Sequence, residues 1–230
     1  EIGEVTDYIR VLDRSGYFET VTLSEDDLKR NDMYRANAQR AKAQSRFADY
    51  HDYLLSLEMT AEIGDFSPLY LQRITQLTNK SNQFNLTTKR YTAEQMEAVY
   101  NSDEYIRLYG KLYDKFGDNG VVAVTIGKTD SEDKGRLDIE LWLMSCRVLK
   151  RDMEFAMLDS LVAQAKKRGI REIYGHYYPT AKNKMVAGLY ESFGFEKISQ
   201  DEEGNTAWRL LVEGYEDKNT VIKVKEEHYA

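Results

Sequence analysis

A change of hydrophobic period in the middle of the chain constrains the fold most strongly. From Leu137 to Val148, apolar side chains largely alternate with others, which is typical of a β-strand. After a short turn, residues 152–168 carry apolar side chains at helical spacing, and Gly169 ends that run. A strand that leads directly into an amphipathic helix indicates a helix packed on a sheet, and therefore an α/β domain.

Strict alternation divides the side chains of this strand between two faces. One face would carry Leu137, Ile139, Leu141 and Leu143, and the other would carry Asp138, Glu140, Trp142, Met144 and Cys146.

Further elements are predicted before and after this unit, and together they indicate a mixed central sheet flanked by helices. Helices should start at Ser67-Pro68 and at Thr92, whose partner Gln95 completes a capping box. Another helix is expected at residues 181–193. Strands are expected at residues 54–60, 105–116, 121–127, 171–178, 195–200 and 206–212.

Residues 1–50 differ from the rest, because residues 25–46 predict a charged helix with few apolar positions. A solvated connecting helix and an arm that docks on another domain are both consistent with this pattern. Since the chain starts at Glu1 and helix-like sequence follows within a few residues, we expect a piece of a longer protein. The predicted domain boundary places the α/β domain at residues 51–230.

Composition excludes several classes of function. The formal net charge of -7 disfavours binding to nucleic acid or to an acidic membrane. Cys146 is the single cysteine, and the three histidines lie far apart in sequence, so neither a disulfide framework nor a metal centre is expected. Without a bilayer-length apolar run or a signal peptide, a cytoplasmic location is expected.

The turn after the long strand has the features of an anion site. A helix that begins there exposes its first free N–H groups, and basic side chains add positive charge. The residues expected to bind a phosphate-bearing cofactor are Arg147, Val148, Lys150 and Arg151. The alternative is that these basic residues lie at a turn and bind no ligand.

The pattern N-x-x-x-A-x-x-Y-x-x-x-G-F from Asn183 to Phe195 resembles the second signature of the GNAT acyltransferase superfamily. The resemblance implies that Tyr190 can protonate a departing thiolate and that Asn183 contacts the pantetheine arm or the substrate. Tyr190 could equally be a packed helix tyrosine. The glycines that GNAT enzymes usually have in the pyrophosphate turn are absent from residues 149–154, which favours a carrier-bound phosphopantetheine thioester over coenzyme A.

Longer stretches, including LTNKSNQFNLTTKRYT, LWLMSCRVLKRDMEFAML and YGHYYPTAKNKMVAGLYESFGF, resemble FkbH-type proteins over roughly residues 5–213. Such proteins join an N-terminal HAD-type phosphatase domain to a C-terminal GNAT-like domain. The resemblance implies delivery of a glyceryl unit to an acyl carrier protein as a thioester, as in methoxymalonyl-type precursor biosynthesis. Residues 1–50 would then link to a HAD-type domain that is missing here, because the D-x-D-x-T motif is absent.

Within this resemblance Cys146 is a candidate nucleophile. Arg147 and the nearby helix N-terminus would favour its thiolate, and His176 on a neighbouring strand is the candidate base. A buried strand cysteine without chemistry is the alternative.

A stretch rich in amide side chains, residues 79–91, supplies the expected substrate site, together with the end of strand 171–178. A loop that only satisfies its own hydrogen bonds is the alternative. The candidate substrate-binding residues are Asn79, Asn82, Gln83, Asn85, Arg90, Tyr178, Thr180 and Lys182.

Three functions remain open from the sequence. The first is a glyceryl or similar acyl transfer to a carrier protein through Cys146 and Tyr190. The second is a non-catalytic module that docks a carrier protein, and the third is an N-acetyltransferase that uses acetyl-CoA.

Overall fold

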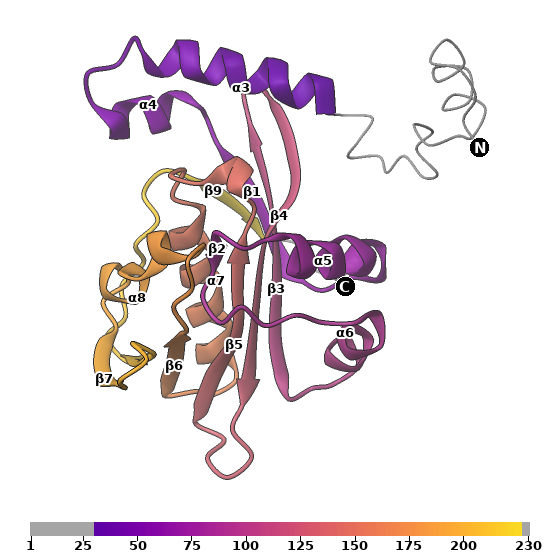
Figure 1. Ribbon diagram of the computed structural model, residues 1–230, viewed down its shortest axis with the longest axis vertical. Coiled ribbons are helices and arrows are strands. Elements are labelled where there is room, and N and C mark those ends of the chain that lie inside the picture. Colours follow the sequence, from indigo (N-terminus) through magenta and orange to yellow (C-terminus); the bar gives the residue numbers. More distant parts are fainter. Residues whose placement is uncertain (1–29, 227–230) are drawn as a thin grey trace, which may run out of the picture. The chain divides into compact units, whose positions relative to one another are not determined.

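Residues 30–226 are described by a computed structural model of the chain (Figure 1). They fall into two units that separate between Lys42 and Ala43, and the second unit contains the whole sheet. Helix α3 (Arg30–Gln44) covers most of the predicted charged helix, and the start of that prediction lies outside the described residues. No helix within residues 30–226 combines the length and apolar composition needed to cross a bilayer.

The second unit is built on one mixed sheet. Its strands follow the order β7-β8-β6-β5-β4-β3-β1-β9, and the short strand β2 pairs with β5 outside this order. The pairs β5–β6 and β1–β9 are parallel, and the other pairs are antiparallel. The strands are β1 (Thr60–Asp65), β2 (Phe84–Asn85), β3 (Tyr105–Asp114), β4 (Gly117–Thr129), β5 (Arg136–Met144), β6 (Glu172–Tyr177), β7 (Glu196–Gln200), β8 (Thr206–Leu211) and β9 (Lys223–Glu226).

Helices cover both faces of the sheet and create two apolar cores (Figure 1). On one face, α7 (Met153–Lys167) packs on β1, β3 and β4, and two of its methionines lie against Gly110 of β3. A Cβ at Gly110 would lie 2.4 Å from the Met153 methyl carbon, so a larger residue there would force the methionine side chains to move. On the other face, α5 (Pro68–Lys80) packs on β4 and α6 (Ala93–Tyr100) packs on β3.

The helix-start signals read from the sequence are confirmed. Ser67 accepts a hydrogen bond from the backbone N–H of Leu69, and Pro68 is the first residue of α5. Thr92 and Gln95 form the reciprocal capping box of α6. These signals act locally, so they need no tertiary partner to take effect.

The strand predicted at residues 54–60 is wrong except at its last residue. Tyr50–Ser56 form helix α4, which starts where the Asp49 side chain accepts a hydrogen bond of 2.9 Å from the N–H of Asp52. The spacing of Leu54 and Leu57 buries both side chains, whereas Leu55 is exposed. Strand β1 begins only at Thr60.

The helix predicted at residues 181–193 is also interrupted. Two short pieces replace it, a 3-10 turn at Lys184–Val186 and helix α8 at Leu189–Ser192. The side-chain oxygen of Asn183 accepts hydrogen bonds from the backbone and hydroxyl of Thr180, which fixes a turn instead of a helical start.

A β-bulge in β5 changes the predicted faces of that strand. Leu141 pairs with Ile126 and Ile139 pairs with Gly127, so Glu140 is the extra residue. After the bulge, Trp142 and Met144 join the core beside α7 with Leu137 and Ile139, and Leu141 and Leu143 join the opposite core. The predicted division of side chains between the two faces of the strand is therefore wrong beyond Glu140. The strand also ends at Met144, and Cys146 lies in a 3-10 turn, Cys146–Val148.

Candidate functional site

Strands β5 and β6 part soon after they begin to pair. Their parallel register covers only Arg136–Asp138 with Glu172–Tyr174. Beyond it, residues 84–88, here called the wedge segment, lie between the two strands. Phe84 and Asn85 pair with the end of β5. Leu86 donates its N–H to the Trp142 carbonyl at 3.1 Å and accepts from the Tyr178 N–H at 2.9 Å.

Asn183 holds the wedge segment in place. Its side-chain nitrogen donates to the carbonyls of Asn85 and Tyr178, each at 2.9 Å, while its oxygen accepts from Thr180. The side chain is fully buried, and both its donor hydrogens are used within the chain. Asn85 is also fully buried; its oxygen accepts from the N–H of Thr88, and its side-chain nitrogen has no partner in the described part of the chain.

A groove of about 380 Å³ opens beside the wedge segment, between the parted strands. We call it the β5–β6 groove. It is lined by Thr87, Thr88, Lys89, Ile139, Glu140, His176 and Tyr178.

Glu140, the bulge residue, is the carboxylate of the β5–β6 groove. Lys89 donates to it at 2.5 Å and the Tyr91 hydroxyl at 3.1 Å. The Thr87 hydroxyl donates to the Glu140 backbone carbonyl at 2.7 Å. Burial, together with the Glu140 charge, raises the pKa of Tyr91, so this phenol remains a hydrogen-bond donor.

His176 lies in the groove beside the ion pair of Asp138 and Arg136. Its Nε2 is 3.4 Å from Asp138 Oδ1, and Arg136 donates two hydrogen bonds to the same carboxylate, at 2.7 and 2.8 Å. Burial opposes the ionisation of Asp138, but hydrogen bonds from His176 and Arg136 outweigh it and lower the pKa of this carboxyl. An ionised carboxylate behind a histidine fixes the ring and supports it as a base.

The amide-rich stretch contributes less to the groove than the sequence predicts. Asn79 donates to the carbonyls of Thr75 and Tyr91, and Arg90 donates to Asn82 and to backbone carbonyls. These contacts stabilise the connection between α5 and α6. Of the candidate substrate residues, Tyr178 lines the groove, whereas Gln83, Thr180 and Lys182 are exposed outside its lining.

The turn before α7 exposes only some of its predicted anion-binding residues. Val148 is fully buried in the core, and Arg151 is buried and bonds to Asp114 at 3.0 Å and Asn119 at 3.4 Å. Lys150 and Cys146 are exposed, and Arg147 is half-buried. The expectation that Arg151 faces a ligand phosphate is therefore wrong, because its charge is already paired with the β3–β4 hairpin.

Cys146 and His176 do not form a bonded pair. Within residues 30–226 no hydrogen bond or ion pair joins them, and His176 is paired with Asp138 instead. Cys146 is an exposed free cysteine that lies beyond the end of β5.

Tyr190 is packed in the core beside β6. A Cβ on Gly175 would lie 2.3 Å from its ring, and the rings of Phe195 and Trp208 lie 5.0 and 6.2 Å away. Its hydroxyl has no well-formed hydrogen bond in the described chain. Burial raises the pKa of Tyr190, and the backbone N–H of His176 offsets only part of this rise.

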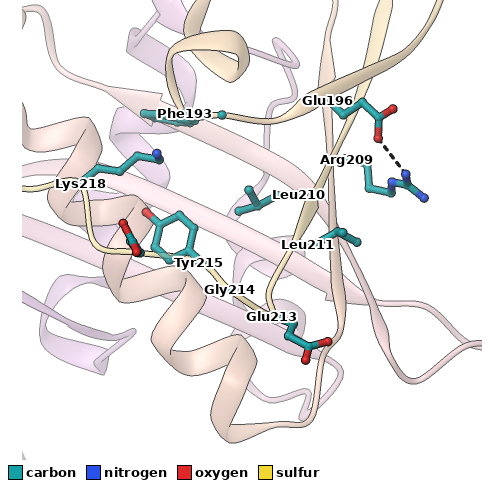
Figure 2. Close-up of a pocket in the computed structure, with 11 residues that line it drawn as sticks. Phe193, Glu196, Arg209, Leu210, Leu211, Glu213, Gly214, Tyr215 and Lys218 are labelled. Carbon is teal, nitrogen blue, oxygen red and sulfur yellow. Dashed lines mark hydrogen bonds and ion pairs between the residues drawn. The ribbon is translucent and has the colours of Figure 1, made fainter.

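A second hollow lies between β8 and the loop that follows it (Figure 2). Several of its polar groups already have partners: Arg209 bonds to Glu196 at 2.8 Å, and the Tyr215 hydroxyl donates at 2.6 Å to Asp159, which lies outside the lining. No histidine or cysteine lines this hollow. The β5–β6 groove is therefore the better candidate site.

Sequence reasoning missed Asp138, Glu140, Thr87 and Thr88 as site residues. The signal for the first two was present, since two acidic side chains in an otherwise apolar strand require partners. The two threonines reach the groove only through the tertiary pairing of the wedge segment.

No protein-family model and no curated protein matches the chain. Solved structures nevertheless share its fold at low identity. The ribosomal-protein-S18-alanine N-acetyltransferase of Escherichia coli superposes with a TM-score of 0.50 and 14% identity, over 70% of this chain and 99% of that chain. The GNAT domain of S. lividans PAT gives 0.51 and 15%, over 65% and 89%.

The yncA protein of Salmonella typhimurium, solved with its cofactor acetyl-CoA, gives a TM-score of 0.50 and 14% identity, over 69% of this chain and 96% of that chain. These similarities show that the chain has the GNAT fold, which confirms the predicted α/β class and the mixed sheet flanked by helices. At such identities they show the fold alone.

Proposed function

We propose that this chain is an acyltransferase domain that transfers a glyceryl or similar small acyl unit to the thiol of an acyl carrier protein, as in FkbH-type proteins. The partners in this proposal are the carrier protein and a HAD-type phosphatase domain elsewhere in the full-length protein. The fold supports acyl transfer in general, and the groove supports a small polar acyl unit.

The observation that carries the proposal is the meeting of a histidine–carboxylate pair with polar side chains in one groove. His176, backed by Asp138, shares the β5–β6 groove with Glu140, Lys89 and Thr88. A hydroxylated acyl chain could exchange hydrogen bonds with these side chains. A base at this place could take the proton from the attacking thiol.

The transfer exchanges one thioester for another. In the direct route, the carrier thiol loses its proton to His176, its sulfur attacks the acyl carbon, and the donor leaves as a thiolate that takes up a proton. In the relay route, the Cys146 thiolate first displaces the donor and the carrier thiol then displaces Cys146. Exposure of Cys146 at the end of β5 supports its access to a thioester.

The test is transfer from glyceryl-pantetheine to a holo acyl carrier protein, followed by intact mass. We expect His176→Gln to lower the rate about 100-fold. We expect Asp138→Asn to lower it about tenfold with little change in KM, because the carboxylate orients the ring instead of binding substrate. The matched control is His51→Gln, since His51 is exposed on α4 outside the groove.

One outcome would contradict the proposal, and another would decide between its two routes. A His176→Gln variant that keeps the wild-type rate would show that the groove takes no part in the transfer. An acyl adduct that forms equally on wild type and Cys146→Ser would exclude the relay route. Acylated carrier protein formed without an enzyme adduct would support the direct route.

An N-acetyltransferase is the second candidate. The yncA protein, which has the same fold, was solved with acetyl-CoA, and the carboxylate of Glu140 is suited to an amine substrate. Acetylation of amines in the presence of acetyl-CoA, without transfer to a carrier thiol, would favour this function over the first.

A further inference from the structure

Thr88, which lines the β5–β6 groove, has a backbone conformation that a β-branched residue rarely adopts. Its φ is 56°, in the left-handed region, where a Cβ crowds the backbone and a branched side chain is tolerated least. Glycine would adopt this conformation without steric cost. Strain of this kind persists only where the surrounding structure enforces it, and it gathers at ligand sites.

Contacts on both sides of Thr88 enforce this conformation. The side-chain oxygen of Asn85 accepts a 2.9 Å hydrogen bond from the Thr88 N–H. The preceding residue, Thr87, donates to the Glu140 carbonyl, and the following residue, Lys89, donates to the Glu140 carboxylate. Three successive residues are thus tied to fixed groups of the fold, which leaves the backbone of the middle one little freedom to relax.

Most polar side chains of the β5–β6 groove already bond to other groups of the chain. This holds for Thr87, Lys89, Glu140 and His176. The hydroxyls of Thr88 and Tyr178 are the exceptions, since neither forms a hydrogen bond within residues 30–226. Tyr178 is 42% exposed, whereas Thr88 is half-buried, so water competes less for the Thr88 hydroxyl.

We propose that Thr88 recognises a hydroxyl group of the acyl unit through its own hydroxyl, which can both donate and accept a hydrogen bond. This inference rests on the acyltransferase function proposed above and names its substrate class, hydroxylated acyl thioesters as opposed to unsubstituted ones. Glycine would relieve the backbone strain but would offer no hydroxyl. An unsubstituted acyl chain leaves the Thr88 hydroxyl unpaired, and a site built to bond a hydroxyl discriminates against such an analogue.

The test uses amide analogues of glyceryl-pantetheine and propionyl-pantetheine, in which NH replaces the thioester sulfur so that no acyl transfer occurs. The two acyl units share one carbon skeleton, and only the glyceryl unit has hydroxyls. Titration calorimetry on the 230-residue chain measures both dissociation constants, and we expect wild type to bind the glyceryl analogue about tenfold more tightly. Thr88→Val keeps the branched shape without the hydroxyl. It should bind the glyceryl analogue about tenfold more weakly than wild type, and the propionyl analogue within about threefold.

Two further substitutions separate recognition from folding. Thr88→Ser keeps the hydroxyl and should retain the preference for the glyceryl analogue. Thr88→Gly suits the left-handed backbone, so it should unfold at a temperature no lower than that of wild type while binding the glyceryl analogue as weakly as Thr88→Val. The matched control is Thr220→Val, which removes a hydroxyl from an exposed position outside the groove and should leave both dissociation constants unchanged.

Equal binding of the two analogues by wild type would overturn the inference, as would wild-type affinity of Thr88→Val for the glyceryl analogue. A lower unfolding temperature of Thr88→Gly would overturn it too, because the threonine would then serve the fold. Absence of binding of either analogue to wild type overturns it as well. A preference that depends on Thr88, without transfer from glyceryl-pantetheine to a holo acyl carrier protein, would reject the proposed function and keep the role of Thr88.

Discussion

The side-chain amide of Asn183 donates a 2.9 Å hydrogen bond to the backbone carbonyl of Asn85, which lies 98 positions earlier in the chain. This bond joins the wedge segment to the turn that follows β6. Where β5 and β6 part, the wedge segment supplies backbone partners, because Phe84 and Asn85 pair with β5 and Leu86 bonds both to Trp142 of β5 and to Tyr178, which follows β6.

We expect Asn183→Ala to lower the free energy of unfolding by about 2–4 kcal/mol. The substitution leaves the carbonyls of Asn85 and Tyr178 and the N–H of Thr180 without this partner, and the bond to the Asn85 carbonyl is buried. Denaturant unfolding monitored by circular dichroism measures the change. Asn101→Ala, at an exposed position after α6, should change stability by less than about 1 kcal/mol. Equal stability of the two variants would contradict the role of Asn183.

Local signals account for the part of the fold that the sequence predicts correctly. The capping box at Thr92 and the long amphipathic helix ended by Gly169 depend on neighbouring residues alone. Strand β2 could not be predicted, because its two residues have no periodicity and form a strand only by pairing with Leu143 and Met144.

Part of the candidate site could likewise be predicted from local sequence signals. His176 and Tyr178 follow from their place at the end of a strand, where α/β sheets bind ligands. The bulge at Glu140 was not predictable from apolar alternation, because an extra residue reverses the pattern without changing composition. The sequence indicates Arg151 as a ligand-binding residue, because its ion pair with Asp114, 37 positions earlier in the chain, is formed only in the folded structure.

Tyr190→Phe tests whether the buried hydroxyl has a chemical role. Because the hydroxyl lacks a well-formed partner, we expect its removal to change the free energy of unfolding by less than about 1 kcal/mol. We also expect the rate of acyl transfer to stay within about threefold of wild type, as 1% exposure leaves little access for a thiolate. Gly175→Ala is the contrasting variant, since its new Cβ would collide with the Tyr190 ring and destabilise the fold. A 100-fold loss of rate in stable Tyr190→Phe would instead support Tyr190 as the proton donor.

Arg151→Met tests the buried ion pair that ties the turn before α7 to the β3–β4 hairpin. The Asp114 side chain is fully buried, so removal of its partner should cost about 3–5 kcal/mol of unfolding free energy. Thermal and denaturant unfolding would both show the loss. Lys167→Met removes the same charge from an exposed position on α7 and should change stability by less than about 0.5 kcal/mol. A variant of Arg151 as stable as this control would show that the pair is not formed.

The stability of the protein should depend on pH through Glu154. Burial raises the pKa of this carboxyl from 4.5 to about 7, an effect that its own backbone N–H opposes and Asp152 increases. Between these two pH values the unfolded chain is ionised while the folded chain keeps its proton. The folded state therefore binds more protons, and its stability is full below pH 4.5 and falls as pH rises through about 7.

Glu154→Gln removes this dependence, because glutamine does not titrate. A rise from 4.5 to about 7 corresponds to about 3 kcal/mol at alkaline pH, so the variant should be more stable than wild type by about that amount at pH 8. Urea unfolding of both proteins at intervals between pH 5 and 8 measures the difference. Asp152, whose pKa is also raised by burial, contributes to both curves. Glu97→Gln, at an exposed position on α6, should follow the wild-type curve, and a constant gap between wild type and Glu154→Gln at every pH would show that Glu154 is ionised in the folded protein throughout.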